Sequence, residues 1–185
     1  MVSCSSVDMT PDVSVSASDP DQANIVFLRS SPFNYKEITS VYEVTGQKLQ
    51  FIGLLNNDTR LTYTVAPGHH LFLVASSTVD YMRAEIEAGR VYYAIVAPGI
   101  GARTRQFSIF PVRNGISGDF YTESREFPYW LSNTQPVKNN EKSWRWHSEN
   151  IERIREMHDK FWPVWEKGKS AWEIERHTLF RTDGL

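Results

Sequence analysis

The sequence is short of several features, and each shortage bears on a class of protein. Cys4 is the only cysteine, so no disulfide can form within the chain and cysteine usage indicates no compartment. The apolar runs, such as HLFLVA, are far shorter than the roughly 20 residues that a helix needs to cross a bilayer. The 20 Lys and Arg residues are outnumbered by 22 Asp and Glu residues, giving a net charge of -2 at pH 7. Because nucleic acids are held by clustered basic side chains, we expect no nucleic-acid partner.

The five histidines lack the spacing of a metal site. His69 and His70 are adjacent in a predicted strand, so their side chains leave from opposite faces. His147 and His158 lie on one predicted helix, about 16 Å apart at 1.5 Å per residue, which is too far to share a zinc ion. HExxH and paired-cysteine motifs are absent as well. We therefore predict no metal or other cofactor, the alternative being a metal site assembled from distant loops.

The sequence contains no evident set of catalytic residues. Ser117 lies in NGISGDF, which lacks the G-x-S-x-G form of a nucleophile elbow. Glu152 and Glu156 lie one helical turn apart, but Arg153 and Arg155 surround them, as on a solvated helix surface. We therefore expect a protein that is not an enzyme. The alternative is an envelope hydrolase whose site residues are dispersed along the chain.

Residues 1–23 are predicted to be a flexible tether. Residues 5–23 contain no Lys or Arg and are rich in Ser, Asp and Pro, a composition that does not form a hydrophobic core. A coil of about 20 residues has a root-mean-square span of roughly 25 Å. The whole chain has 41% hydrophobic and 23% charged residues, which is typical of a globular protein. One folded domain is therefore expected to follow the tether.

Residues 24–113 have the pattern of an all-β domain. Short runs rich in Val, Ile, Phe and Tyr recur at intervals of roughly ten residues, separated by turn residues. Leu61, Tyr63 and Val65 alternate with polar residues, as in a strand with one buried face. We predict at least six strands, joined mainly as antiparallel neighbours. The expected fold is mainly β: an antiparallel β-sandwich with a C-terminal helical extension.

The period changes toward the C-terminus. Residues 114–140 are rich in Gly, Asn, Ser and Pro and are predicted to be an irregular crossover. Residues 141–185 are predicted to be a helical extension packed on the sandwich. Within them, side chains recur at steps of three and four residues, which places them on one helix face: Trp144, His147, Ile151, Ile154, His158 and Phe161.

Local signals set the expected helix ends. Asn140 suits the N-cap of the first helix, and Pro163 is expected to end or kink it near residue 162. Ser170 and Glu173 have the spacing of a capping box and predict a second, short helix.

Arg103, Arg105 and Trp146 are candidate contacts to a ligand or partner. The loop PGIGARTRQ places two glycines before the arginines, an arrangement that can hold an anion. It lacks the third glycine of a dinucleotide fingerprint and the Lys-Ser/Thr pair of a P-loop, so a hairpin tip with solvated arginines is the alternative. All six tryptophans lie in the final third of the chain. Trp144 continues the helical stripe and is expected in the core, whereas Trp146 lies two residues off it and is expected to be exposed.

The first residues resemble the end of a bacterial lipoprotein signal. MVSC followed by Ser-Ser is similar to a lipobox, in which a small residue precedes the cysteine that becomes the lipidated N-terminus. The resemblance implies that Cys4 is acylated and that the signal peptide is truncated in this sequence, because its charged and apolar parts are missing. Ser5, rather than Asp, after the cysteine implies transfer to the outer membrane. The alternative is a free thiol on the tail of a cytosolic protein.

The β region carries a second resemblance. The stretches TYTVAPGHHLFLVAS, AEIEAGRVYYAIVAP and RQFSIFPV are similar to the small β-sandwich domains of uncharacterised bacterial lipoproteins. FWPVWEKGKSAW and the terminal LFRTDGL look like the tail of such proteins. The resemblance implies a fold and an anchor, but no activity and no catalytic residues.

These expectations combine into one functional hypothesis. The chain is expected to be a lipid-anchored binding or structural module of the bacterial cell envelope, at the outer membrane facing the periplasm. Besides the membrane, its expected partner is an envelope protein or a cell-wall polymer. The alternatives are the envelope hydrolase and a cytosolic globular protein.

Overall fold

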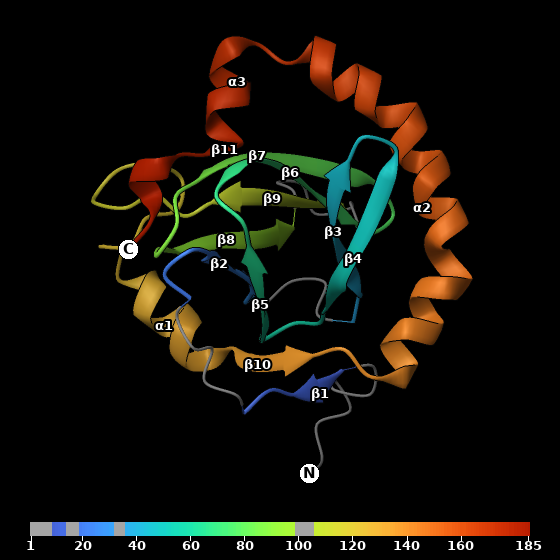
Figure 1. The fold of residues 1–185 in the computed structure, drawn as a ribbon, viewed down its shortest axis with the longest axis horizontal. Helices are drawn as coiled ribbons and strands as arrows, with labels where there is room; N and C mark the ends of the chain where they lie inside the picture. The colour runs from blue at the N-terminus through green and yellow to red at the C-terminus, as the bar shows by residue number, and fades with distance from the viewer. Residues whose placement is uncertain (1–8, 14–18, 32–35, 99–105) are drawn as a thin grey trace.

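The computed structural model describes residues 9–13, 19–31, 36–98 and 106–185. Figure 1 shows strands gathered into the body of the molecule and a long C-terminal helix that curves around one side of it. The fold is mainly β, a β-sandwich with a C-terminal helical extension, as the strand and helix periods of the sequence predict.

The first sheet has six strands in the order β1-β10-β5-β2-β8-β9. Its central strand β2 pairs antiparallel with β5 and parallel with β8, and β10 pairs parallel with β5. The sheet is therefore mixed rather than purely antiparallel. The strand bounds are Thr10–Pro11 (β1), Gln135–Lys138 (β10), Thr59–Val65 (β5), Ala23–Arg29 (β2), Val91–Pro98 (β8) and Phe107–Pro111 (β9).

The second sheet has five strands in the order β11-β7-β6-β3-β4. Strands β4, β3, β6 and β7 pair antiparallel, and the two residues of β11 pair parallel with β7. The prediction of at least six strands is confirmed, since β2 to β9 all lie between residues 23 and 111. The bounds are Thr178–Leu179 (β11), Val79–Ile86 (β7), Gly68–Ala75 (β6), Thr39–Thr45 (β3) and Lys48–Leu55 (β4).

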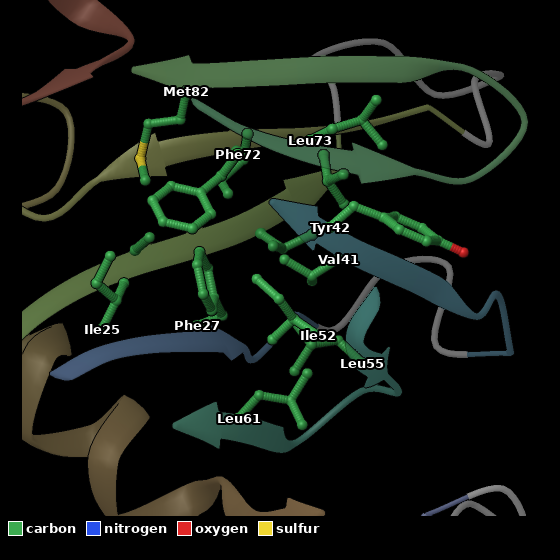
Figure 2. Packing of buried hydrophobic residues seen from close by; sticks show 14 of the residues in the cluster. Ile25, Phe27, Val41, Tyr42, Ile52, Leu55, Leu61, Phe72, Leu73 and Met82 are labelled. Atoms are coloured by element: carbon green, nitrogen blue, oxygen red, sulfur yellow. The ribbon is translucent and has the colours of Figure 1, made fainter. Parts of the chain in front are cut away.

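The core lies between the inner faces of the two sheets (Figure 2). Ile25 and Phe27 from β2 face Phe72 from β6 and Met82 from β7, and all four are fully buried. The rings of Phe27 and Phe72 meet edge to face with their centres 5.2 Å apart. Residues two apart on each strand share a face, so this alternation leaves the odd-numbered side chains of β7 on the outer face of the second sheet.

Helix α2 (Glu141–Gly168) covers that outer face. Asn140 caps it as expected: its side-chain oxygen accepts hydrogen bonds from the backbone N–H groups of Lys142 and Ser143. Of the two alternatives expected at Pro163, an end of the helix near residue 162 is wrong, because α2 continues to Gly168 with Pro163 inside it. Pro163 is exposed, so water can hydrate the carbonyl that loses its hydrogen bond.

The packed stripe of α2 differs in part from the expected one. Ile154 is fully buried and Ile151 packs against the core, as expected. Phe161 is not part of the core; Trp162 and Trp165 pack there instead. Because α2 continues beyond Pro163, positions 154, 158, 162 and 165 form the inward stripe.

Two segments expected to be irregular carry regular structure. The interval 114–140 contains helix α1 (Glu126–Asn133) and strand β10, so its description as an irregular crossover is wrong for these residues. Within the expected tether, Met9 is 3% exposed and Thr10–Pro11 forms β1 beside β10. This part of the N-terminal region is therefore packed on the folded domain.

The chain ends in short elements that close one end of the sandwich. Helix α3 (Ala171–Arg176) begins with the expected capping box, in which Ser170 Oγ accepts from Glu173 N–H and Glu173 Oε2 accepts from Ser170 N–H. Strand β11 and a 3-10 turn, η1 (Arg181–Asp183), follow. Among the described residues, no helix is long and apolar enough to cross a membrane.

Candidate functional site

Two clefts lie on either side of α3 and form the candidate functional region. The larger one, here the large cleft, has a volume of about 750 Å³. Its floor is the outer face of β6 and β7, and its walls come from the C-terminal half of α2, from α3 and from the segment after β11. The side chains that line it include His69, Arg83, Glu85, Trp162, Glu166 and Glu175.

An aromatic stack holds one wall of the large cleft in place. The indole of Trp162 stacks on that of Trp165, with ring centres 5.5 Å apart and planes 18° apart. Tyr81, which is fully buried, meets Trp162 edge to face at 5.0 Å. Trp165 Nε1 in turn donates a hydrogen bond of 3.0 Å to Asp80 Oδ1. This aromatic wall is therefore preformed in the absence of a ligand.

Charged groups of both signs line the large cleft. Arg83 lies over the Trp165 ring, 5.8 Å from its centre, and Glu85 lies 3.9 Å from Arg181. The side chains of Glu166 and Glu175 have no hydrogen-bond or ion-pair partner within the described part of the chain. They are the acceptors that a polar ligand in this cleft can use.

The second cleft, here the small cleft, has a volume of about 400 Å³ and lies on the other side of α3. Two ion pairs form its sides: Arg113 Nη1 lies 2.7 Å from Asp183 Oδ2, and Arg176 Nε lies 2.5 Å from Asp119 Oδ2. Trp172 lines it from α3. Its lining also includes Phe110, Asn114, Ser117, Gly118 and Glu175.

His70 belongs to a hydrogen-bonded cluster at one end of the sandwich. Its Nδ1 lies 2.6 Å from Glu43 Oε1, and its Nε2 lies 2.9 Å from the carbonyl oxygen of Ala66. Tyr63 Oη donates to the other oxygen of Glu43 at 2.6 Å. Both partners of the His70 ring are acceptors, and this geometry favours the cationic ring, in which both nitrogens carry protons. The hydrogen bond to Glu43 raises the pKa of His70, and the same bond lowers the pKa of Glu43.

His147, His158 and His177 are structural. His147 Nδ1 lies 3.2 Å from Tyr42 Oη and its ring stacks on Phe51, while His158 Nδ1 lies 2.9 Å from Tyr81 Oη. Burial lowers the pKa of all three histidines. No group of three metal-ligating side chains occurs among the residues that the structure describes.

Of the residues proposed from the sequence as ligand or partner contacts, Trp146 is the one that the structure describes. Cys4, Arg103 and Arg105 lie outside the described residues. The interpretation of Trp146 and Trp144 is reversed: Trp146 is half-buried and packs against the core, whereas Trp144 is 49% exposed. Alternating steps of three and four residues have a period of about 3.5, whereas an α-helix has 3.6 residues per turn. Over the length of α2 the side chains that face the sheet therefore shift gradually around the helix.

Sequence reasoning missed the small cleft. Trp172, Arg176 and Asp119 line it, but Asp119 is more than fifty residues from the other two in the chain. One signal was available: Trp172 lies beside the capping box of a helix too short to bury it. The pairing of Arg176 with Asp119 depends on tertiary structure and leaves no local pattern.

Comparison with known proteins gives little guidance. No family profile matches the chain. A segment of 96 residues is 29% identical to a protein pelota homolog of Methanocella arvoryzae. The match covers 52% of this chain and 27% of the length of that protein. A partial likeness of this kind carries no activity, substrate or partner over to the chain.

Proposed function

We propose that this protein is a lipid-anchored binding module of the cell envelope, which holds a cell-wall polymer in the large cleft. One observation carries the proposal: a preformed cleft of about 750 Å³ with a fixed aromatic wall and free carboxylates, which lies within the size range of ligand sites. Aromatic faces and a few placed polar groups are the usual means by which such sites bind polar organic ligands.

A binding role fits the chemistry of the cleft better than catalysis does. Of its histidines, His69 is exposed and has no hydrogen bond to a hydroxyl or thiol within the described residues, and His70 is held by Glu43 and Ala66. A hydrolase would need a nucleophile beside a base, a pair of placed carboxylates or a metal-bound water. The free carboxylates of Glu166 and Glu175 are the one feature of the large cleft that the envelope hydrolase shares with the binding proposal.

The anchoring part of the proposal rests on Cys4. A thioether-linked diacylglycerol and an amide-linked third chain at Cys4 would hold the protein at a membrane without a spanning helix, since each buried CH₂ contributes about 0.8 kcal/mol. In this proposal the protein lies at the outer membrane and faces the periplasm. The residues before β1 would then place the sandwich close to the bilayer, because Met9 is already packed on it.

Co-sedimentation with purified peptidoglycan sacculi tests the binding function. The chain is incubated with sacculi and centrifuged, and the pelleted fraction is measured for wild type and for Glu166→Lys, which reverses a charge in the large cleft. Glu149→Lys, an exposed residue on the same helix, is the matched control. We expect wild type and the control to pellet and Glu166→Lys to pellet at least fivefold less. Equal pelleting of all three would contradict binding through this cleft, and no pelleting of wild type would contradict the polymer as ligand.

A further inference from the structure

The small cleft presents an aromatic ring to solvent. Trp172 is 66% exposed, the highest value among the tryptophans of this chain, all of which the structure describes. A tryptophan side chain is normally largely buried, because its ring carries more apolar area than any other side chain. The guanidinium of Arg176 lies over the ring, 5.7 Å from its centre.

The ring and its support are held in place. Arg176 lies between Trp172 and Phe110, with its guanidinium 5.1 Å from the centre of the Phe110 ring. Asp119 fixes the same guanidinium through the 2.5 Å contact to Nε. Trp172 itself is the second residue of α3 and lies between the two residues of the capping box, Ser170 and Glu173. The platform therefore needs little rearrangement to receive a ligand.

Polar groups without partners lie in the same cleft. Asp119 Oδ1, the Ser117 hydroxyl and the Asn114 side-chain amide nitrogen make no hydrogen bond within the described part of the chain. Together they offer one acceptor, one donor and one group that is both. A sugar hydroxyl is itself a donor and an acceptor, so a mixed set of this kind can satisfy neighbouring hydroxyls.

The charged groups of the small cleft select against an anionic ligand. Each of its two arginines is paired with a carboxylate, Arg113 with Asp183 and Arg176 with Asp119. Arg113 also donates to the carbonyl oxygens of Thr178 and Glu175, so its guanidinium is already occupied. A phosphate would find no free guanidinium fork of the kind that usually binds it.

We infer that the small cleft is a binding site for an uncharged saccharide, whose pyranose ring packs against the exposed side chain of Trp172 and whose hydroxyls bond to Asp119, Ser117 and Asn114. The cleft volume of about 400 Å³ lies within the range of small-ligand sites. The inference deepens the proposed function and rests on it only for the source of the sugar, the glycan part of a cell-wall polymer.

Titration with soluble oligosaccharides tests the inference. Tetra-N-acetylchitotetraose and cellotetraose are added to the isotopically labelled chain, and the six indole N–H resonances are followed by NMR. We expect the Trp172 resonance to shift on addition of at least one sugar, and Trp172→Ala to weaken binding at least tenfold. Trp172→Phe, which keeps an aromatic face, should retain part of the affinity. Trp144→Ala is the control, because Trp144 is also exposed but lies near the N-terminal end of α2, whereas α3 follows its C-terminal end.

Each other outcome overturns the inference. If neither sugar shifts the Trp172 resonance, the cleft is not a saccharide site. If Trp144→Ala weakens binding as much as Trp172→Ala does, the sugar binds elsewhere. The failure of this inference is distinguishable from that of the proposed function: sacculi would still pellet the protein through Glu166 while the soluble sugars leave Trp172 unchanged.

Discussion

The indole nitrogen of Trp165 donates a hydrogen bond of 3.0 Å to Asp80 Oδ1, and this contact ties α2 to the place where the two sheets meet. The other carboxylate oxygen of Asp80 accepts from the backbone N–H of Ile109 at 3.3 Å. His177 Nδ1 lies 3.1 Å from the carbonyl oxygen of Ile109. The side chains of Asp80 and His177 therefore satisfy the N–H and C=O groups of Ile109, which lie on the outer edge of β9. At Ile109 the edge of β9 is therefore not free to pair with another strand.

Replacing Asp80 by Ala should therefore destabilise the whole domain. Asp80 is 9% exposed, and its loss leaves Trp165 Nε1 and Ile109 N–H buried without their acceptors. We expect the free energy of unfolding to fall by about 3 kcal/mol, since each buried group left unsatisfied costs about 1–3 kcal/mol. Urea denaturation measures this, with the exposed Asp159→Ala as control. A loss of stability no greater than that of the control would mean that this junction does not hold the sheets together.

Ile154→Asp should unfold or strongly destabilise the protein. Ile154 is fully buried where α2 packs on the second sheet, so the substitution buries a charge and removes apolar packing. We expect a loss of at least about 3 kcal/mol, measured by thermal or urea unfolding. Arg145→Asp, on an exposed position of the same helix, should change stability by less than about 1 kcal/mol. An unchanged melting temperature for Ile154→Asp would show that α2 is detached from the sandwich.

The pair of Glu43 and His70 predicts a stability that depends on pH. The pKa of His70 is raised above its ordinary value of 6.5, so its contribution is complete below pH 6.5 and is lost as the pH rises through the raised value. The pKa of Glu43 is lowered from 4.5, so its contribution is complete above pH 4.5 and is lost as the pH falls through the lowered value. The pair should stabilise the fold most between pH 4.5 and 6.5.

His70→Gln isolates this effect, because Gln can still donate a hydrogen bond to Glu43 but does not titrate. The difference in the free energy of unfolding between wild type and His70→Gln should be larger at pH 5.5 than at pH 9. Urea titrations at the two pH values measure it, and other titrating groups cancel in the difference. A difference that is equal at both pH values, or larger at pH 9, would contradict a cationic His70.

Chelation should leave the protein folded. The histidines that the structure describes are engaged with tyrosines, Glu43 or backbone carbonyls, apart from the exposed His69. We expect the melting temperature to stay unchanged when EDTA is added, and elemental analysis to find no stoichiometric metal in wild type or in His69→Ala. A stoichiometric zinc or iron ion in purified protein would overturn this prediction and favour the hydrolase.

The sequence was a good guide where the signal is local. Alternation such as that of Leu61, Tyr63 and Val65 predicts strands because side chains two apart share a face. Asn140 and the Ser170–Glu173 pair mark helix starts correctly because a cap is made by residues within three positions of one another. Such features depend on neighbours in the chain and little on the rest of the fold.

The sequence was a poor guide where tertiary contacts decide. Pro163 did not end α2. Trp162 and Trp165, on either side of it, pack against the core and stabilise the helix across the turn in which Pro163 leaves one hydrogen bond unmade. The exposed Trp172 differs from the buried Trp165 in one local signal alone, its position at the start of a short helix. Both clefts combine residues from strands and helices far apart in the chain, so no window of the sequence contains either one.

The central claim, that the protein is an anchored envelope module, is tested most directly by the mass of its N-terminal segment. The protein is purified in detergent from cells that carry the intact gene, digested, and the peptide that begins at Cys4 is measured by mass spectrometry. We predict a peptide whose N-terminal residue is Cys4, with a diacylglycerol on sulfur and a third acyl chain on nitrogen, and we predict that Cys4→Ala moves the protein to the soluble fraction. An unmodified Cys4 in protein that fractionates as soluble would contradict the account and favour the cytosolic alternative.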